Sequence, residues 1–205
     1  FTSTGAITAA SLDASGTSLQ VGNVTATAGS IILAGDTITA QNLSSTLGTQ
    51  VTATNGNLTL GNVVAGGAVA LLTSTAGQIT TGTLSGSQIS VDGQGAVSVG
   101  GVTTTGATLL RSRTSTFTST GAITGISIDI SGASLQFGDV TATAGAITLA
   151  GDTITAQNLS STLGTQVTTT NGNLTLGNVV AGGAVALLTS AAGQITTGTL
   201  SGSQI

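Results

Sequence analysis

The chain has 205 residues, only 4% of them charged, and its six acidic and two basic residues leave a net charge of −4. Typical soluble proteins carry about 25% charged residues, and nucleic-acid binding needs clustered Lys and Arg. The composition therefore argues against a nucleic-acid partner and against an anionic membrane surface. The longest aliphatic run is AVALL, at 68–72 and again at 184–188, whereas a membrane-spanning helix needs roughly 18 apolar residues. We expect no membrane insertion of this segment.

Two internal periods organise the chain. Residues 1–89 align with residues 117–205 without a gap, and 78 of the 89 aligned positions are identical. A first superrepeat of 116 residues therefore spans 1–116, and an incomplete second copy occupies 117–205. Within each copy an eight-residue pattern such as LTLGNVVA (58–65) recurs every 18–21 residues. We expect a single continuous segment over 1–205.

The first position of the pattern always holds an apolar residue. In a strand such as LTL the first and third side chains share one face, and the second points to the other face. We expect the first position to face a core, and the sixth position, from Ala6 and Val24 to Ala122 and beyond, to face it from the next side. In chain order after Phe1, the predicted core residues at the first position are Leu19, Ile38, Leu58, Ile79, Val97, Phe117, Leu135, Ile154, Leu174 and Ile195.

The fifth position holds Gly, Asn or Asp in nine of the eleven occurrences, beginning with Gly5. These residues enter the left-handed region of backbone conformation at the least cost. We therefore expect the chain to turn a corner there through that region. The predicted corner residues are Asn23, Asn42, Asn62, Gly101, Gly121, Asp139, Asn158 and Asn178.

Coils of about 19–20 residues with two or three short strands are typical of a parallel β-helix, here with 10–11 rungs. Thr, Val, Ile and Ser predominate, and no stretch shows the 3.6-residue period of a helix. The LxxLxLxxN signature of leucine-rich repeats is absent. Equivalent residues of successive coils would lie about 4.8 Å apart, so a charge repeated in one column would face its own copy. This repulsion explains the scarcity of charged residues.

The two ends of the segment look uncapped. Solenoids need polar caps at their ends, and neither Phe1 nor Ile205 lies in such a sequence. We expect the segment to be an excerpt from a longer tandem array, with further copies of the same repeat as its partners. The neutral, Ser- and Thr-rich outer faces would also allow lateral self-association into fibres.

Coils such as TAGAITLAGDTITAQNLSS (143–161) and TNGNLTLGNVVAGG (170–183) resemble the repeats of filamentous-haemagglutinin-type proteins, which are large bacterial surface exoproteins. The resemblance implies a right-handed parallel β-helical shaft. It also implies secretion by the two-partner route or as an autotransporter, an extracellular position on the cell surface, and a role in adhesion, biofilm or delivery of a distal toxin.

The acidic residues are the first candidates for chemistry. Glycosidic cleavage needs two carboxyl groups several Å apart, and here whole coils separate the acids. Asp36 and Asp152 lie in GDT turns and Asp139 at a corner, where we expect the side chains to cap turns; calcium binding is the alternative, although it needs several oxygen ligands. Without His, Lys or Glu, no Ser or Thr has a base to activate it. We expect no catalytic residue, cofactor or metal. The complete set of acids is Asp13, Asp36, Asp92, Asp129, Asp139 and Asp152.

Arg111 and Arg113 form the only basic spot, and alternation places both on one face, which we expect to meet solvent. A neighbouring shaft or an acidic glycan is the alternative contact. An ice-binding solenoid would instead need a flat Thr ladder. The Thr pairs of this chain fall in different columns, since the positions that match Thr25 are expected to be Ile7, Ser44, Val64, Ser85 and Thr103.

We therefore predict a non-catalytic structural shaft or filament segment of a large secreted bacterial cell-surface protein. The alternative is a glycan- or receptor-binding face of a β-helical adhesin, which an exposed aromatic row would favour. Phe1, Phe117 and Phe137 are the only aromatic residues, and all three fall on inward positions. A polysaccharide-cleaving β-helix is disfavoured because acid–base clusters are missing.

Overall fold

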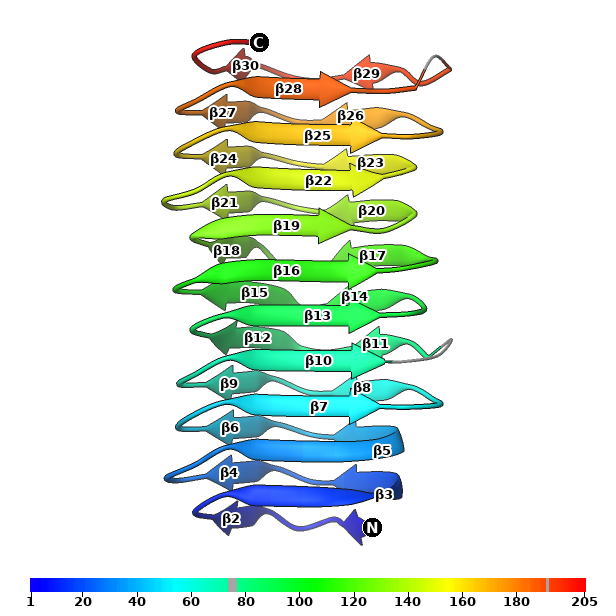
Figure 1. The fold of residues 1–205 in the computed structure, drawn as a ribbon, viewed down its shortest axis with the longest axis vertical. Helices are drawn as coiled ribbons and strands as arrows, with labels where there is room; N and C mark the ends of the chain where they lie inside the picture. Colours follow the sequence, from blue (N-terminus) through cyan, green and yellow to red (C-terminus); the bar gives the residue numbers. More distant parts are fainter. Residues whose placement is uncertain (74–76, 191) are drawn as a thin grey trace.

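The computed structural model describes residues 1–73, 77–190 and 192–205, and all regular elements in these ranges are β-strands. The strands wind into an uninterrupted stack of coils (Figure 1). In this view the chain runs to the right on the near side and returns to the left behind it while it rises, so the coil is right-handed. Strands of successive coils pair in parallel. The predicted right-handed parallel β-helix is confirmed.

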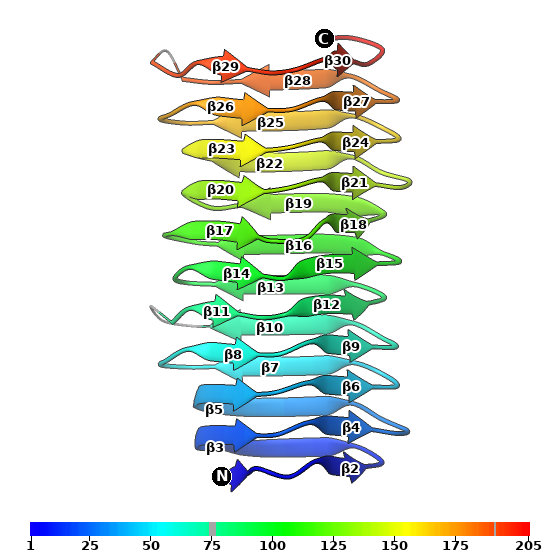
Figure 2. The same cartoon turned by 180° about the vertical axis from the view of Figure 1, so that it is seen from behind.

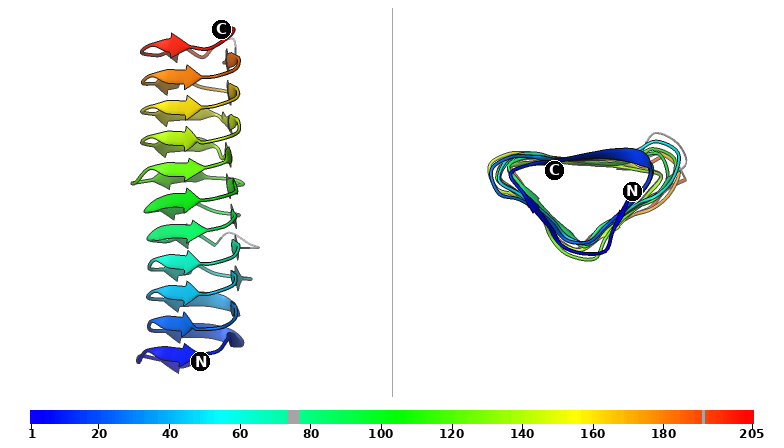
Figure 3. Two further views of the ribbon diagram at one scale, coloured as in Figure 1. Left: turned by 90° about the vertical axis from the view of Figure 1, so that its left-hand side faces the viewer. Right: turned by 90° about the horizontal axis from the view of Figure 1, so that it is seen from below.

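Each coil is a triangle with three strand-bearing sides (Figure 3). These sides become three faces of the stack, one seen in front in Figure 1 and the other two in Figure 2. The wide face contains β7 (Thr49–Ala53), β10 (Val69–Thr73), β13 (Ile89–Gly93), β16 (Ala107–Ser112), β19 (Ser127–Ser131), β22 (Ile147–Gly151), β25 (Thr165–Thr169) and β28 (Val185–Leu188). The second face contains β1 (Thr2–Ser3), β8 (Leu58–Leu60), β11 (Ile79–Thr80), β14 (Val97–Val99), β17 (Thr116–Ser119), β20 (Ser134–Phe137), β23 (Thr153–Ala156), β26 (Leu174–Leu176) and β29 (Ile195–Thr196).

The third face is a separate sheet of 11 strands, whereas the wide and second faces are joined into one sheet of 19 strands. The joint is made by two long strands, β3 (Leu12–Val21) and β5 (Ile31–Ala40), which bend around the edge between those faces (Figure 3). The third face contains β2 (Ile7–Ala9), β4 (Val24–Ala26), β6 (Leu43–Ser45), β9 (Val63–Ala65), β12 (Thr83–Gly86), β15 (Gly101–Thr104), β18 (Ile123–Gly125), β21 (Val140–Ala142), β24 (Leu159–Ser161), β27 (Val179–Ala181) and β30 (Leu200–Ser201).

The core is a column of aliphatic side chains inside the triangle. The coil that contains β8, β9 and β10 shows the rule, because alternate residues of each strand are buried and the others face outward. Burial of one Val or Leu side chain contributes about 1.5–3 kcal/mol. Each coil therefore adds several such contributions, and it needs its neighbours above and below to cover them.

The first position of the repeat stacks in register along the whole chain. Leu19 pairs with Ile38, Ile38 with Leu58, and the series continues through Val97 and Phe117 to the last coil. Nine of the ten predicted core side chains are at most 1% exposed. Ile195 is the exception, being 45% exposed in the last coil, where no further coil covers it.

The three aromatic residues do not all lie inside. Phe117 and Phe137 are buried and pack edge to face, with their ring centroids 6.3 Å apart. Phe1, which the sequence pattern placed inward, is 61% exposed because it begins the first coil and has packing partners on one side only.

The corner between the second and third faces differs from the expectation. Among the described residues no residue other than glycine has a positive φ, so Asn62 and its counterparts do not adopt the left-handed conformation. Gly61 is needed there because a Cβ atom would collide with the backbone carbonyl oxygen of Gln41 in the coil below. The corner thus depends on close backbone approach, and the residue after the glycine has another task.

That task is to accept hydrogen bonds from the next coil. The Oδ1 atom of Asn42 accepts from the backbone N–H of Asn62 at 3.0 Å, and Asn62 Oδ1 accepts from the N–H of Thr83 at 2.9 Å. The same ladder starts at Asn23 and is repeated in the second copy from Asp139 through Asn158 and Asn178 to Thr199. Asn and Asp occupy this corner because their side-chain oxygen satisfies a backbone donor that the sheet leaves free.

Two predicted positions in this corner are shifted by one residue. The residue in register with Val102 and Val140 is Ile123, so Ala122 occupies the corner and Gly121 lies one position before it. Likewise Ile7, and not Ala6, pairs with Val24. A larger apolar side chain gains more from burial than alanine does. These two coils therefore place an extra residue in the corner so that isoleucine points inward. Gly101 keeps its predicted place, in register with Thr83.

Candidate functional site

The charged residues are distributed unevenly around the axis. All eight charged side chains of the chain lie within the described residues. Asp139 is at the corner between the second and third faces, and the other seven lie on the wide face or at its edge with the second face: Asp13, Asp36, Asp92, Arg111, Arg113, Asp129 and Asp152. Any charge-based chemistry of this segment is therefore confined to one side of the stack.

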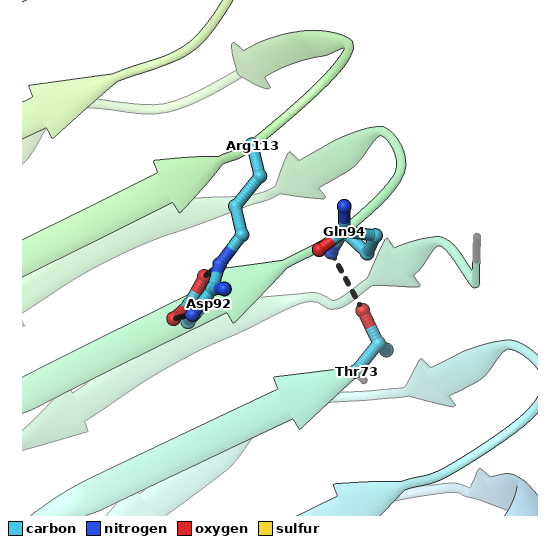
Figure 4. Close-up of polar contacts among 4 residues, drawn as sticks. All are labelled: Thr73, Asp92, Gln94 and Arg113. Atoms are coloured by element: carbon cyan, nitrogen blue, oxygen red, sulfur yellow. Dashed lines mark hydrogen bonds and ion pairs between the residues drawn. The ribbon is translucent and has the colours of Figure 1, made fainter. Parts of the chain in front are cut away.

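Both arginines lie close to Asp92 on this side, and Arg113 is paired with it. Asp92 in β13 is in register with Arg111 in β16, and Arg113 follows β16 by one residue. Arg113 reaches back to the coil below and donates through Nε to Asp92 Oδ1 at 2.7 Å and through an Nη atom to Oδ2 at 2.5 Å (Figure 4). Such bidentate pairing fixes the orientation of both side chains. The arginine side chain is 49% exposed, so water screens the pair.

The pair shifts the ionisation of both partners in the expected directions. The hydrogen bond from Arg113 lowers the pKa of Asp92, against a smaller opposing effect of its partial burial, and the charge of Arg111 adds to the lowering. The same hydrogen bond raises the pKa of Arg113. The side chain of Arg111 forms no hydrogen bond or ion pair with any residue that the structure describes. Its guanidinium is therefore the available cation of this site.

Arg111 lines an open groove of about 560 Å³ at the edge between the wide and second faces, together with Arg113, Ser131, Gly132, Asp152 and Thr170. The groove exists because two successive coils turn tightly here. Only two residues separate β19 from β20, and one residue separates β22 from β23, whereas residues 170–173 form a longer turn after β25. The groove can offer a cation, a carboxylate and hydroxyl groups to a polar ligand.

Asp36 and Asp152 link successive coils. Asp36 Oδ1 accepts from Thr54 Oγ1 at 2.6 Å and from Asn55 Nδ2 at 2.7 Å, in the turn of the next coil. Asp152 repeats the arrangement with Thr170 and with Asn171 Nδ2 at 2.9 Å. The expectation of turn capping thus needs one correction, because each carboxylate caps the turn of the following coil and not its own.

The two acids not yet described, Asp13 and Asp129, do not line this groove. Within 1–73, 77–190 and 192–205 the structure shows no cluster of three or more acidic, His or Cys side chains that could hold a metal ion. In the same ranges no helix is long and apolar enough to cross a membrane.

Threonine forms one nearly regular outward column. On the second face, positions in register with Thr59 carry Thr in most coils, with Gln20, Ser98 and Gln136 as interruptions. On the third face the outward column mixes Thr, Ser and Val, and Thr8, not Ile7, is in register with Thr25. A regular ice-binding face would keep Thr in every coil, whereas this column is interrupted by Gln20, Ser98 and Gln136.

A comparison with models of protein families found no match for this chain, and searches of curated proteins and of solved structures found none either. The strand pairing by itself defines the class of this chain, a parallel β-solenoid built from tandem repeats.

Sequence reasoning missed the pairing of Asp92 with Arg113. The two residues are 21 positions apart, which is one turn of the coil. Their pairing could therefore have been predicted from the repeat period. An acid and a base separated by one period lie on adjacent strands of one face, where opposite charges attract each other.

Proposed function

We propose that this segment is a non-catalytic structural shaft, which holds other parts of a longer chain at a distance. The observation that supports this most directly is the unbroken in-register column from Leu19 to Ile195. A continuous core of this kind resists bending, because each interior coil is paired with both neighbours by strands on all three faces. Charge, the usual requirement of catalysis, is scarce and mostly engaged in links between coils.

The superrepeat gives the shaft a natural unit of length. Six coils make one 116-residue unit, and a spacing of about 4.8 Å between coils gives about 29 Å per unit. The resemblance to haemagglutinin-type repeats supports a position outside the cell, as part of a secreted surface protein such as an adhesin or an extracellular fibre. In this proposal the neighbours of the segment along the axis are further copies of the same repeat.

The test is to vary the number of units. We would place one, two and four 116-residue units between a cell-surface anchor and a fluorescent domain, and measure the height of that domain above the membrane. The shaft predicts a linear increase of about 29 Å per unit. A height that does not depend on the number of units would refute the role as a spacer. Incubation with a panel of polysaccharides should release no product, and turnover would refute the non-catalytic part.

A second candidate function is supported by the groove beside Arg111. Its unpaired guanidinium and the hydroxyl groups around it suit the carboxylate of an acidic glycan. Arg111→Gln should then weaken binding of a uronic-acid oligosaccharide far more than Arg113→Gln, which removes the same charge but one already paired with Asp92. Equal effects of the two substitutions would contradict this candidate.

A further inference from the structure

The third face differs from the rest of the surface in its combination of exposed apolar side chains and missing charge. Val64 and Val180, which are equivalent residues of the two copies, are each 50% exposed, and each is the middle residue of its third-face strand. Leu47, Ile126 and Leu163 are also exposed, in the turns that follow the third-face strands. Apart from Asp139 at one edge, no charged side chain of the chain lies on this face.

The in-register neighbours of the exposed apolar residues differ between the third face and the wide face. Val64 lies between Ser44 and Ser85 on the strands above and below it. On the wide face, by contrast, exposed Ile32 is in register with Asp13, and exposed Leu72 with Asp92. A charge beside an exposed apolar group opposes association with another surface, because the charge would have to lose its water. The wide face has this protection at Ile32 and Leu72, although exposed Leu188 is in register with Thr168. On the third face neither exposed valine has a charged in-register neighbour.

The spacing of the apolar residues indicates what kind of partner fits. Val64 and Val180 are separated by one superrepeat, which is about 29 Å along the axis at about 4.8 Å per coil. Leu47 and Leu163 repeat the same spacing. A partner that contacts both copies at once must present matching groups at this interval on a flat, rigid surface. Another molecule of this solenoid has that period by construction.

The area of the face agrees with an interface that grows with the array. The face has eleven strands. With a spacing of about 4.8 Å and a strand length of about 10 Å, its flat area is roughly 500 Å². Stable interfaces bury about 800 Å² per partner. One chain of 205 residues should therefore associate weakly. Each further superrepeat would add contacts between two molecules that are already held together, so it would strengthen association without a second loss of translational and rotational entropy.

We propose that the third face is a lateral docking surface for a second copy of the same solenoid. The two third faces pack against each other, and the contact contains Val64, Val180 and the outward Ser and Thr hydroxyls of the same strands. The charged wide faces then point outward on both sides of the pair. This inference rests on the proposed shaft and specifies which of its faces bundles.

The test compares two double variants in the full 205-residue chain. Val64→Lys with Val180→Lys places a charge twice on the third face. Thr59→Lys with Thr175→Lys places the same charge on the exposed second face of the same two coils. In sedimentation velocity across a concentration series, the third-face variant should raise the concentration of half-association at least about tenfold, because each lysine loses its water in the contact. The second-face variant should resemble the unsubstituted chain.

A second measurement uses the absence of cysteine from the chain. Val64→Cys with Val180→Cys should form disulfide-linked dimers under mild oxidation, and Thr59→Cys with Thr175→Cys should not. An unsubstituted chain that stays monomeric at every concentration, equal effects of the two lysine variants, or preferential crosslinking through the second face would each overturn the proposal. A rod that stays monomeric would leave the proposed spacer role intact, because height above the membrane is measured on single chains.

Discussion

Single side chains in this protein act mainly on the coil that follows their own. The Asn ladder at the corner and the carboxylates of Asp36 and Asp152 all accept hydrogen bonds from residues 18–21 positions later. A substitution at one such residue therefore removes a bond between coils, whereas the local turn keeps its backbone. Such substitutions can therefore measure how much a residue contributes to the stacking of coils, separately from its contribution to the turn.

Asn62→Ala should lower the free energy of unfolding by about 0.5–1.5 kcal/mol, because the Thr83 N–H loses its acceptor. Asn62→Asp keeps an oxygen at the same place and should be closer to the original stability. The natural example is Asp139, whose Oδ1 accepts from the Asn158 N–H at 3.2 Å. Urea denaturation of the three proteins measures the difference, and equal losses for Ala and Asp would contradict the ladder.

Thr108 offers the opposite case, a residue whose replacement should stabilise the protein. Its Oγ1 is buried without a hydrogen-bond partner among the described residues, and it stacks between Ile89 and Ile128. Thr108→Val should raise the free energy of unfolding by about 1 kcal/mol, since a buried unsatisfied hydroxyl is removed. Thr49→Val is the control, because Thr49 Oγ1 bonds Ser45 Oγ at 2.9 Å and its loss should destabilise. A Thr108→Val protein no more stable than the original would contradict this prediction.

The ion pair of Asp92 and Arg113 should add a modest dependence on pH. Arg113 lowers the pKa of Asp92 in the folded state, so the stabilisation is complete above the pH at which an unfolded aspartate titrates, about 3.9. It is lost as the pH falls further, through the folded-state value. Urea midpoints of the original chain and of Asp92→Asn should therefore differ at neutral pH and converge in acid. A gap between them that stays constant down to the most acidic condition would argue against the pair.

At the scale of the strand, the alternation of side chains decides which substitutions are tolerated. Val63 and Val64 are consecutive residues of β9, the first fully buried and the second half exposed. Val63→Asp should cost at least about 3 kcal/mol, because an unpaired charge would enter the core. Val64→Asp should change stability by less than about 0.5 kcal/mol, as surface substitutions do. Comparable melting of the two variants would refute the inward assignment of position 63.

The strands also show how far sequence alone reaches. The period and the alternation were sufficient to predict the fold class and the stacking of Leu19 on Ile38 and Leu58. Burial requires an apolar residue at the same position of every coil, and this requirement is visible in the sequence. The inward position after the corner was predicted at Ala122 but is occupied by Ile123. A fixed eight-residue pattern cannot show that this corner contains one more residue than the others. The left-handed corner was wrong because glycine serves close packing there, and packing between coils leaves no local signal.

The candidate groove was harder to predict from the sequence than the fold. The two arginines stand out in the sequence, but the availability of Arg111 follows from Arg113 being engaged by Asp92 one coil below. The groove itself results from the short turns after β19 and β22. Turn lengths vary between coils without changing the core, so the repeat gives no information about them.

At the scale of the whole molecule, the three faces have different characters. Charge gathers on the wide face and its edge, the second face carries the threonine column, and the third face exposes apolar residues without charge. A solenoid can maintain such a difference over any length, because each face is made by one segment of every coil. The three faces therefore make the solenoid chemically different in each direction around its axis. The parallel strands also make its two ends different.

The parallel pairing of all coils has a mechanical consequence. Backbone hydrogen bonds in a β-helix run along its long axis, so tension applied to the two termini strains the bonds of the terminal coil before those of the interior. Such a tether should peel one coil at a time, and each coil of 18–21 residues would release about 60 Å of chain. Single-molecule pulling should show a staircase of small, similar extensions, and one abrupt rupture of the whole stack would contradict it. A solenoid that unwinds in this way would absorb a sudden load by lengthening and would rewind when the load falls.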